Sequence, residues 1–197
     1  MIGVFAEPDD PAATPLTPEE MCALIPACIV YRHELNEAEQ ENIISGQEWA
    51  LSRRHRTLLS EDFVRRLHNR MFGDIWRWAG QFRNSPGNIG IDHWLILVEL
   101  RQLLDDAKAW IEFGAWPVDE IAVRFHHRLV LIHPFPNGNG RHAWLMADLL
   151  VIRLGRERFS CERESPRDPG AARAHYLAAL RAADKHDISP LVAFSRA

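Results

Sequence analysis

The sequence predicts a mainly α-helical fold, and two observations carry that prediction. Apolar residues recur at helical spacing in successive segments, and most of these segments begin or end at residues that favour helix termini. Only residues 80–93 break the pattern, because glycine and proline there alternate with Phe and Ile. We expect a small β-hairpin flap in that segment and helices elsewhere.

The N-terminal part should contain an arm and two helices. Residues 1–16 are rich in proline and acidic residues, so we expect an extended arm. Thr17 is followed by Pro-Glu-Glu, a helix-start pattern, and that helix should reach about Leu24. A second helix should start at Asn36 and end in the basic stretch 53–56.

The remaining helices follow from caps and prolines. Ser60 should cap a third helix, and a long one should run from Asp92 to Gly114. Another should begin at Pro117 and stop before Pro134, because the residue preceding a proline avoids helical backbone. Further helices are expected from the glycines of 138–140 to Gly155, from Ala171 to Lys185, and after Ser189.

Composition limits the functional classes. The 197 residues are 47% hydrophobic and 25% charged, typical of one soluble globular domain. A net charge of −4 argues against broad nucleic-acid or membrane-surface binding. The apolar runs are too short to span a membrane, and residues 1–10 do not resemble a secretory signal. Three cysteines without a CxxC pair fit a reducing cytoplasm.

The loop His133-Pro134-Phe135-Pro136-Asn137-Gly138-Asn139-Gly140-Arg141 carries the chemistry that the sequence indicates. Gly138 and Gly140 allow successive N–H groups to converge on an anion at a helix N-terminus. Arg141 is unfavourable for the helix dipole at that end, and a bound phosphate would resolve the conflict. His133 is placed to act as a general base. A plain helix connection with a capping histidine is the alternative.

The same nine residues match the signature of the Fic family, usually written His-Pro-Phe-x-Asp/Glu-Gly-Asn-Gly-Arg. The segment Trp78 to Arg83 resembles the Gly-x-x-Arg element before the Fic flap, and the likeness spans roughly residues 60–195. It implies a Fic-type helical bundle over 59–197, preceded by N-terminal helices in 17–58. The N-terminal part and the loop look most similar to the subgroup called mobile mystery protein B, which occurs on bacterial mobile elements.

The resemblance implies a protein adenylyltransferase that moves AMP from ATP, with Mg²⁺, to a hydroxyl of a target protein. His133 would be the base and Phe135 the buried anchor of the loop. The residues implied to hold the phosphates are Gly138, Asn139, Gly140 and Arg141. Those implied to align the target on the flap are Asn84, Ser85, Gly87, Asn88, Ile89, Gly90 and Ile91. The subgroup also implies a small DNA-binding partner, without direct nucleic-acid binding by this chain.

Two positions depart from the family pattern. Asn137 stands where the family has the carboxylate that binds Mg²⁺, and an amide oxygen is a weaker ligand for a hard cation. Trp144 replaces a second arginine, and an indole cannot replace a guanidinium at a phosphate. A degenerate Fic fold that binds nucleotide or a partner without turnover is therefore the alternative. Doc-type phosphate transfer is disfavoured because those members carry lysine at the position of Gly140.

Many Fic proteins restrain themselves with a helix glutamate that pairs the second arginine. Glu41 and Glu34 are imperfect matches to that pattern. Because Trp144 removes the partner, we expect this inhibition to be weakened or lost, and we interpret Glu41 as a surface helix residue.

Overall fold

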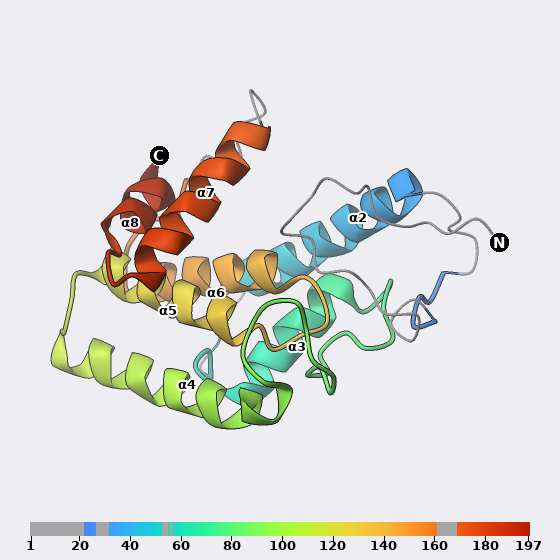
Figure 1. Cartoon of the computed structure of the whole chain (residues 1–197), viewed down its shortest axis with the longest axis horizontal. Helices are drawn as coiled ribbons and strands as arrows, with labels where there is room; N and C mark the ends of the chain where they lie inside the picture. The colour runs from blue at the N-terminus through green and yellow to red at the C-terminus, as the bar shows by residue number, and fades with distance from the viewer. Residues whose placement is uncertain (1–21, 27–31, 53–54, 56, 161–168) are drawn as a thin grey trace.

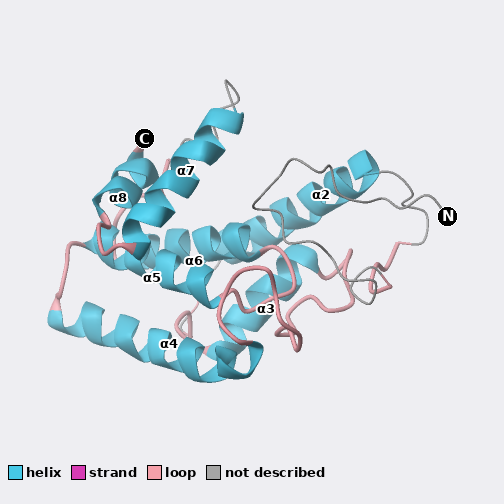
Figure 2. Cartoon of the chain, viewed as in Figure 1, coloured by secondary structure: helices cyan, strands magenta, loops and turns pink. Residues whose placement is uncertain are grey.

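The structure is a computed structural model that describes residues 22–26, 32–52, 55, 57–160 and 169–197 (Figure 1). Its helices in chain order are α2 (Arg32–Leu51), α3 (Glu61–Phe72), the 3₁₀ helix η1 (His93–Leu95), α4 (Ile96–Phe113), α5 (Val118–Ile132), α6 (Asn139–Arg153), α7 (Pro169–Asp184) and α8 (Ser189–Arg196). Helices and loops make up the described chain in Figure 2, apart from one isolated antiparallel bridge between Leu24 and Trp76. The mainly α-helical prediction is confirmed.

The helices α5 and α6 form the centre of the molecule. Because the loop between them is short, they pack against each other as a hairpin. The helix α4 lies along one side of α5, and the α7–α8 pair lies on the opposite side (Figure 1). The α2–α3 pair packs on α6. Buried residues occur around nearly the whole circumference of α6, which is typical of a helix enclosed by others. The loop between α5 and α6 is therefore fixed at both ends by the best-packed helices.

Capping residues set several helix ends where the sequence predicts them. The Ser60 hydroxyl accepts a hydrogen bond from the Phe63 N–H at 3.2 Å and starts α3. At the end of α4, Gly114 takes left-handed backbone with φ of 58°. The helix α5 stops at Ile132, before Pro134, as expected. The helix α2 starts at Arg32, earlier than the predicted Asn36.

The N-terminal predictions are only partly covered. Residues 22–24, the end of the helix predicted from Thr17, form a turn and the bridge to Trp76, so this end of the prediction is wrong. The bridge holds the chain extended at Leu24 in place of a last helical turn. The arm at 1–16 and the rest of that helix lie outside the described residues, as do Arg53, Arg54 and Arg56.

The predicted hairpin is not confirmed, because residues 81–92 form an irregular loop. The carbonyls of Ser85 and Ile91, one on each side of this loop, both accept hydrogen bonds from the Arg83 guanidinium. The two sides are thus joined through one side chain instead of through a ladder of backbone hydrogen bonds.

Trp144 lies in the core, with 5% of its surface exposed. Its indole stacks on the His126 ring at a centroid distance of 3.8 Å. Around it lie aromatic rings from the C-terminal part of the chain, namely Phe159, Tyr176 and Phe194. Trp144 therefore joins α5 and α6 to the C-terminal part of the chain. None of the described helices has the length and apolar composition needed to cross a membrane.

A substitution of Trp144 by arginine should destabilise the fold. The change Trp144→Arg removes a packed indole and places a guanidinium among aromatic rings, which should cost about 3–5 kcal/mol of unfolding free energy. Trp144→Phe keeps an aromatic ring and should cost clearly less. Denaturant unfolding of both variants measures the difference. An arginine variant as stable as the phenylalanine variant would contradict this placement.

Candidate functional site

His133 stands at the junction between α5 and the loop that follows it. It caps the helix with left-handed backbone, φ 51° and ψ 59°, and its N–H donates to the Leu129 carbonyl at 3.2 Å. A non-glycine residue in this region carries backbone strain, and such strain clusters at functional sites. The sequence prediction that His133 follows the end of this helix is confirmed.

The His133 imidazole is held in its neutral form. It is 6% exposed, and burial, which outweighs a backbone hydrogen bond at Val130 that acts in the opposite direction, lowers its pKa to about 4. The positive charge of Arg83 lowers the pKa further. At neutral pH the ring is therefore unprotonated and chemically able to accept a proton.

The side chain of Asn139 fixes the shape of the loop. Its Oδ1 accepts from the Phe135 N–H at 2.9 Å, and its Nδ2 donates to the Phe135 carbonyl at 2.8 Å. The Phe135 ring is fully buried, which agrees with its predicted place as an anchor. Both ends of the Asn139 amide thus serve the loop, so this residue offers a phosphate its backbone N–H.

The first turn of α6 presents backbone N–H groups at the end of this loop. An α-helix leaves its first N–H groups without acceptors in the helix, and in α6 these belong to Asn139, Gly140 and Arg141. A side chain at Gly138, whose φ is +76°, would collide with the Phe72 ring at 2.4 Å, whereas space is open beside Gly140. Geometry and dipole together make this turn suited to an anion.

Asn137 offers little to a metal ion in this arrangement. Its Oδ1 accepts a hydrogen bond from the Gly138 N–H at 2.7 Å. Within the described part of the chain, no group of three His, Cys, Asp or Glu side chains is placed to hold a metal. The residues present therefore do not fit a magnesium ion held by the protein itself.

Glu39 is a site residue that the sequence analysis missed. Its Oε2 lies 3.1 Å from Nη2 of Arg141, while its Oε1 accepts from the Trp76 indole N–H at 2.8 Å. Glu41 is exposed on α2, as predicted. Two residues along a helix correspond to about 200° of rotation, so the facing position was Glu39. The side chain of Glu34 lies outside the described residues.

Arg83 ties the 81–92 loop to the end of α5. Its Nε donates to the His133 carbonyl at 2.7 Å, and its Nη2 also reaches the Ile132 carbonyl at 3.5 Å. Its own N–H donates to the Pro134 carbonyl at 2.9 Å. The residue is 6% exposed, and burial lowers the pKa of its guanidinium. Its charge therefore sits where helix carbonyls accumulate partial negative charge.

The residues predicted to dock a target all lie on this loop. Asn84, Gly87, Asn88, Ile89 and Gly90 are exposed, while Ser85 and Ile91 are half-buried. Gly90, with φ of +97°, lies against His133, and a Cβ there would come within 2.4 Å of the His133 Cβ. The structure thus brings the 81–92 loop and His133 into direct contact.

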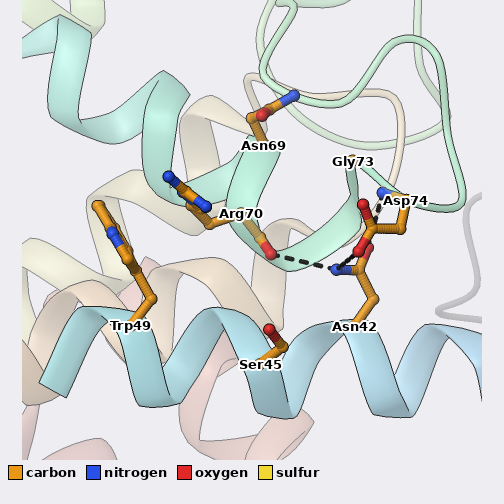
Figure 3. Close-up of a pocket in the computed structure, with 7 residues that line it drawn as sticks. All are labelled: Asn42, Ser45, Trp49, Asn69, Arg70, Gly73 and Asp74. Atoms are coloured by element: carbon orange, nitrogen blue, oxygen red, sulfur yellow. Dashed lines mark hydrogen bonds between the residues drawn. The ribbon is translucent and has the colours of Figure 1, made fainter. Parts of the chain in front are cut away.

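A polar cavity of about 160 Å³ lies away from the motif loop, between α2 and α3 (Figure 3). Its lining consists of Asn42, Ser45, Trp49, Asn69, Arg70, Gly73 and Asp74. Asn42 crosses from α2, and its Nδ2 donates to the Arg70 carbonyl and to Asp74 Oδ2. This contact fixes the helix that carries Glu39.

Known proteins are similar to this chain in sequence and in fold. The model of the Fic/DOC family matches residues 58–151, which include α5, the loop after it and α6 as far as Val151. The segment 58–151 is therefore a segment of the Fic/DOC family. Protein adenylyltransferase fic-1 of Caenorhabditis elegans is 27% identical over 167 aligned residues, and the match covers 79% of this chain and 31% of that protein. This chain thus spans about a third of the length of the curated relatives it matches.

Solved structures agree with the Fic assignment. The structure titled Fic-1 (aa134 - 508) from C. elegans matches 90% of this chain and 52% of that chain, with a TM-score of 0.65 and 25% identity. An N-terminal Fic domain from Bartonella quintana with bound ADP gives a TM-score of 0.69 at 16% identity, covering 86% of each chain. The second likeness concerns the fold alone.

Three buried histidines should make the stability of the protein depend on pH. Burial lowers the pKa of His133 to about 4 and that of His142 to about 3, and it holds the pKa of His68 well below 6.5. Between these values and about 6.5, the unfolded chain binds protons that the folded chain does not. The unfolding free energy should therefore be constant above about pH 6.5 and fall as the pH drops below it.

Urea unfolding between pH 8 and pH 4.5 measures this dependence. Each buried histidine should contribute a slope of up to about 1.4 kcal/mol per pH unit below pH 6.5. Since His142 Nε2 donates to the Val64 carbonyl, His142→Gln keeps a donor there and should reduce the slope. A stability that stays flat down to pH 5 would contradict the neutral state of these rings.

Proposed function

We propose that this chain is a protein adenylyltransferase, which transfers AMP from ATP to a hydroxyl group of a target protein. One observation carries the proposal: a neutral, buried histidine and the first turn of a helix, with open space beside Gly140, share a single segment of nine residues. The relatives named protein adenylyltransferase support it. Asn139, Gly140 and Arg141 would hold the α- and β-phosphates through backbone N–H groups and the Arg141 side chain. The Gly138 N–H, which the sequence analysis placed with them, donates to Asn137 Oδ1 instead.

The proposed step is an in-line displacement at the α-phosphorus. The target hydroxyl oxygen forms the new bond to phosphorus, the bond between the α-phosphorus and its bridging oxygen breaks, and pyrophosphate leaves. His133 accepts the hydroxyl proton, for which a neutral ring is required. Donors at the helix N-terminus stabilise the charge that develops on the phosphate oxygens.

The 81–92 loop would hold the target segment. Its exposed residues Asn84 and Gly87 to Gly90 lie on the loop that contacts His133, and an extended peptide could pair with backbone groups there. Arg83 attaches the start of the loop to the last carbonyl groups of α5. The target hydroxyl would thereby meet the imidazole in a set orientation.

The residues of the motif loop would contribute little to the binding of Mg²⁺. When bound, the ion neutralises charge on nucleotide phosphates, but the chain contributes only the amide oxygen of Asn137, which faces Gly138. We therefore propose that the phosphates themselves are the main ligands of any Mg²⁺ that accompanies ATP.

The mobile mystery protein B subgroup, a small DNA-binding partner and a cytoplasmic location also stay predictions.

A second candidate function is nucleotide or partner binding without turnover. Two observations favour it: the Trp144 indole is packed in the core and brings no charge to the phosphates, and Asn137 is neutral. This candidate keeps the same anion site at α6. It differs only in the absence of transfer.

Labelled ATP distinguishes the two candidates. Incubation with α-labelled ATP, Mg²⁺ or Mn²⁺ and a cell lysate should label a target protein, and His133→Ala should reduce this labelling by at least about a hundredfold, the usual contribution of a general base. ATP labelled at the γ position should leave the target unlabelled. Labelling that persists in a folded His133→Ala protein would contradict the role of the base. ADP binding without any labelling would establish the second candidate.

Glu39 should compete with the nucleotide for Arg141. Glu39→Gln keeps an acceptor for the Trp76 N–H but removes the carboxylate charge, so ADP should bind at least about fivefold more tightly, on the order of 1 kcal/mol. Glu41→Gln makes the same change in net charge at an exposed position of α2 and should leave the Kd unchanged. Calorimetric titration measures both. Equal effects of the two substitutions would rule out local competition.

A further inference from the structure

His68 lies outside the motif and joins the two loops of the site. It is fully buried on α3, on the side that faces the motif loop. Its Nδ1 accepts a hydrogen bond from the Gly80 N–H at 3.0 Å, at the start of the 81–92 loop. Its Nε2 lies 3.0 Å from the carbonyl oxygen of Asn137 in the motif loop.

These two partners determine the form of the ring. A backbone N–H can only donate, so Nδ1 carries no proton, and a carbonyl can only accept, so Nε2 carries one. The imidazole is therefore neutral with its hydrogen on Nε2. Burial and the neighbouring groups His142 and Arg141 act in the same direction, since they lower its pKa.

The His68 ring also packs on the anchor of the motif loop. It stacks on the Phe135 ring at a centroid distance of 3.7 Å with an interplanar angle of 20°. The backbone of Asn137 and the side chain of Phe135 are thus both held by one ring. Because Asn137 precedes the helix α6, this contact sets where the first N–H groups of α6 point.

The other end of the ring meets an equally restricted turn. Gly80 has φ of +77°, and a Cβ there would lie 2.9 Å from the Arg65 carbonyl oxygen. Asn69, next to His68 on α3, donates from Nδ2 to the Ala79 carbonyl at 3.1 Å. The start of the docking loop is therefore seated on α3 at the same place as the motif loop.

We propose that His68 is a positioning residue for the proposed transfer, one that sets the phosphate-binding loop through Nε2 and the target-docking loop through Nδ1. This assignment rests on the proposed function for its effect on activity. The contacts themselves make two separable demands on the ring. One is a donor toward Asn137, and the other is an acceptor toward Gly80.

Two substitutions separate these demands. The glutamine of His68→Gln reaches the position of Nε2 and can keep the donor to Asn137, while it loses the acceptor for Gly80. The asparagine of His68→Asn reaches the position of Nδ1 and can keep that acceptor, while it loses the donor. His68→Phe keeps the stacked ring and loses both hydrogen bonds.

The readouts are ADP affinity by calorimetry, the KM for the target, and amide exchange at Gly80 and Phe135. His68→Asn should weaken ADP binding about tenfold and speed exchange at Phe135, with Gly80 still protected. His68→Gln should weaken ADP binding clearly less than His68→Asn does, but with about tenfold faster exchange at Gly80 and a higher target KM. His68→Phe should show both losses.

A crossed pattern of effects supports the positioning role. A residue that only stabilises the fold would make both variants lose both properties in proportion to their loss of stability, and that result overturns the proposal, as does the absence of any effect. If the unchanged protein binds no ADP, the proposed function fails. Amide exchange at Gly80 and Phe135 then still decides whether His68 holds the two loops separately.

Discussion

The buried guanidinium of Arg83 at the carboxyl end of α5 is the interaction on which the site depends. A buried charge must have hydrogen-bond partners, and a helix end has carbonyls that lack them. Arg83 satisfies the carbonyls of Ile132 and His133 and, on the other side, those of the 81–92 loop. One side chain thus meets two requirements and places the 81–92 loop against the proposed base. Gly90 completes this contact, since a side chain there would collide with His133.

The electrostatics of the first turn of α6 depend on Arg141, a cation at the helix end where the dipole favours negative charge. Arg141 opposes the helix dipole, and Glu39 offsets this conflict by pairing with it in the protein without nucleotide. A phosphate would offer the same compensation with more negative charge. Glu39 and the proposed nucleotide would therefore compete for the guanidinium of Arg141. Position 144 holds a tryptophan that is buried in the core, so it supplies no second guanidinium that either of them could use instead.

The sequence predicts the fold well where local rules decide it. The limits of α5 and α6 follow from Pro134 and from the glycines, which restrict backbone conformation at their own positions. The hairpin prediction fails because the carbonyls of the 81–92 loop bond to Arg83, a contact that no local pattern contains. Glu39 escapes notice for a related reason. Which of several glutamates on α2 faces Arg141 depends on how that helix is rotated against α6, and this is set by tertiary contacts such as Asn42 with Asp74.

The central claim is that the first turn of α6 binds nucleotide phosphates. Titration of the ¹⁵N-labelled protein with ADP, followed by amide chemical shifts, tests it most directly. The account predicts saturable shifts that are largest at the N–H groups of Asn139, Gly140 and Arg141. Saturable shifts centred instead on the cavity near Arg70 and Asp74, or no shifts at millimolar ADP, would contradict it.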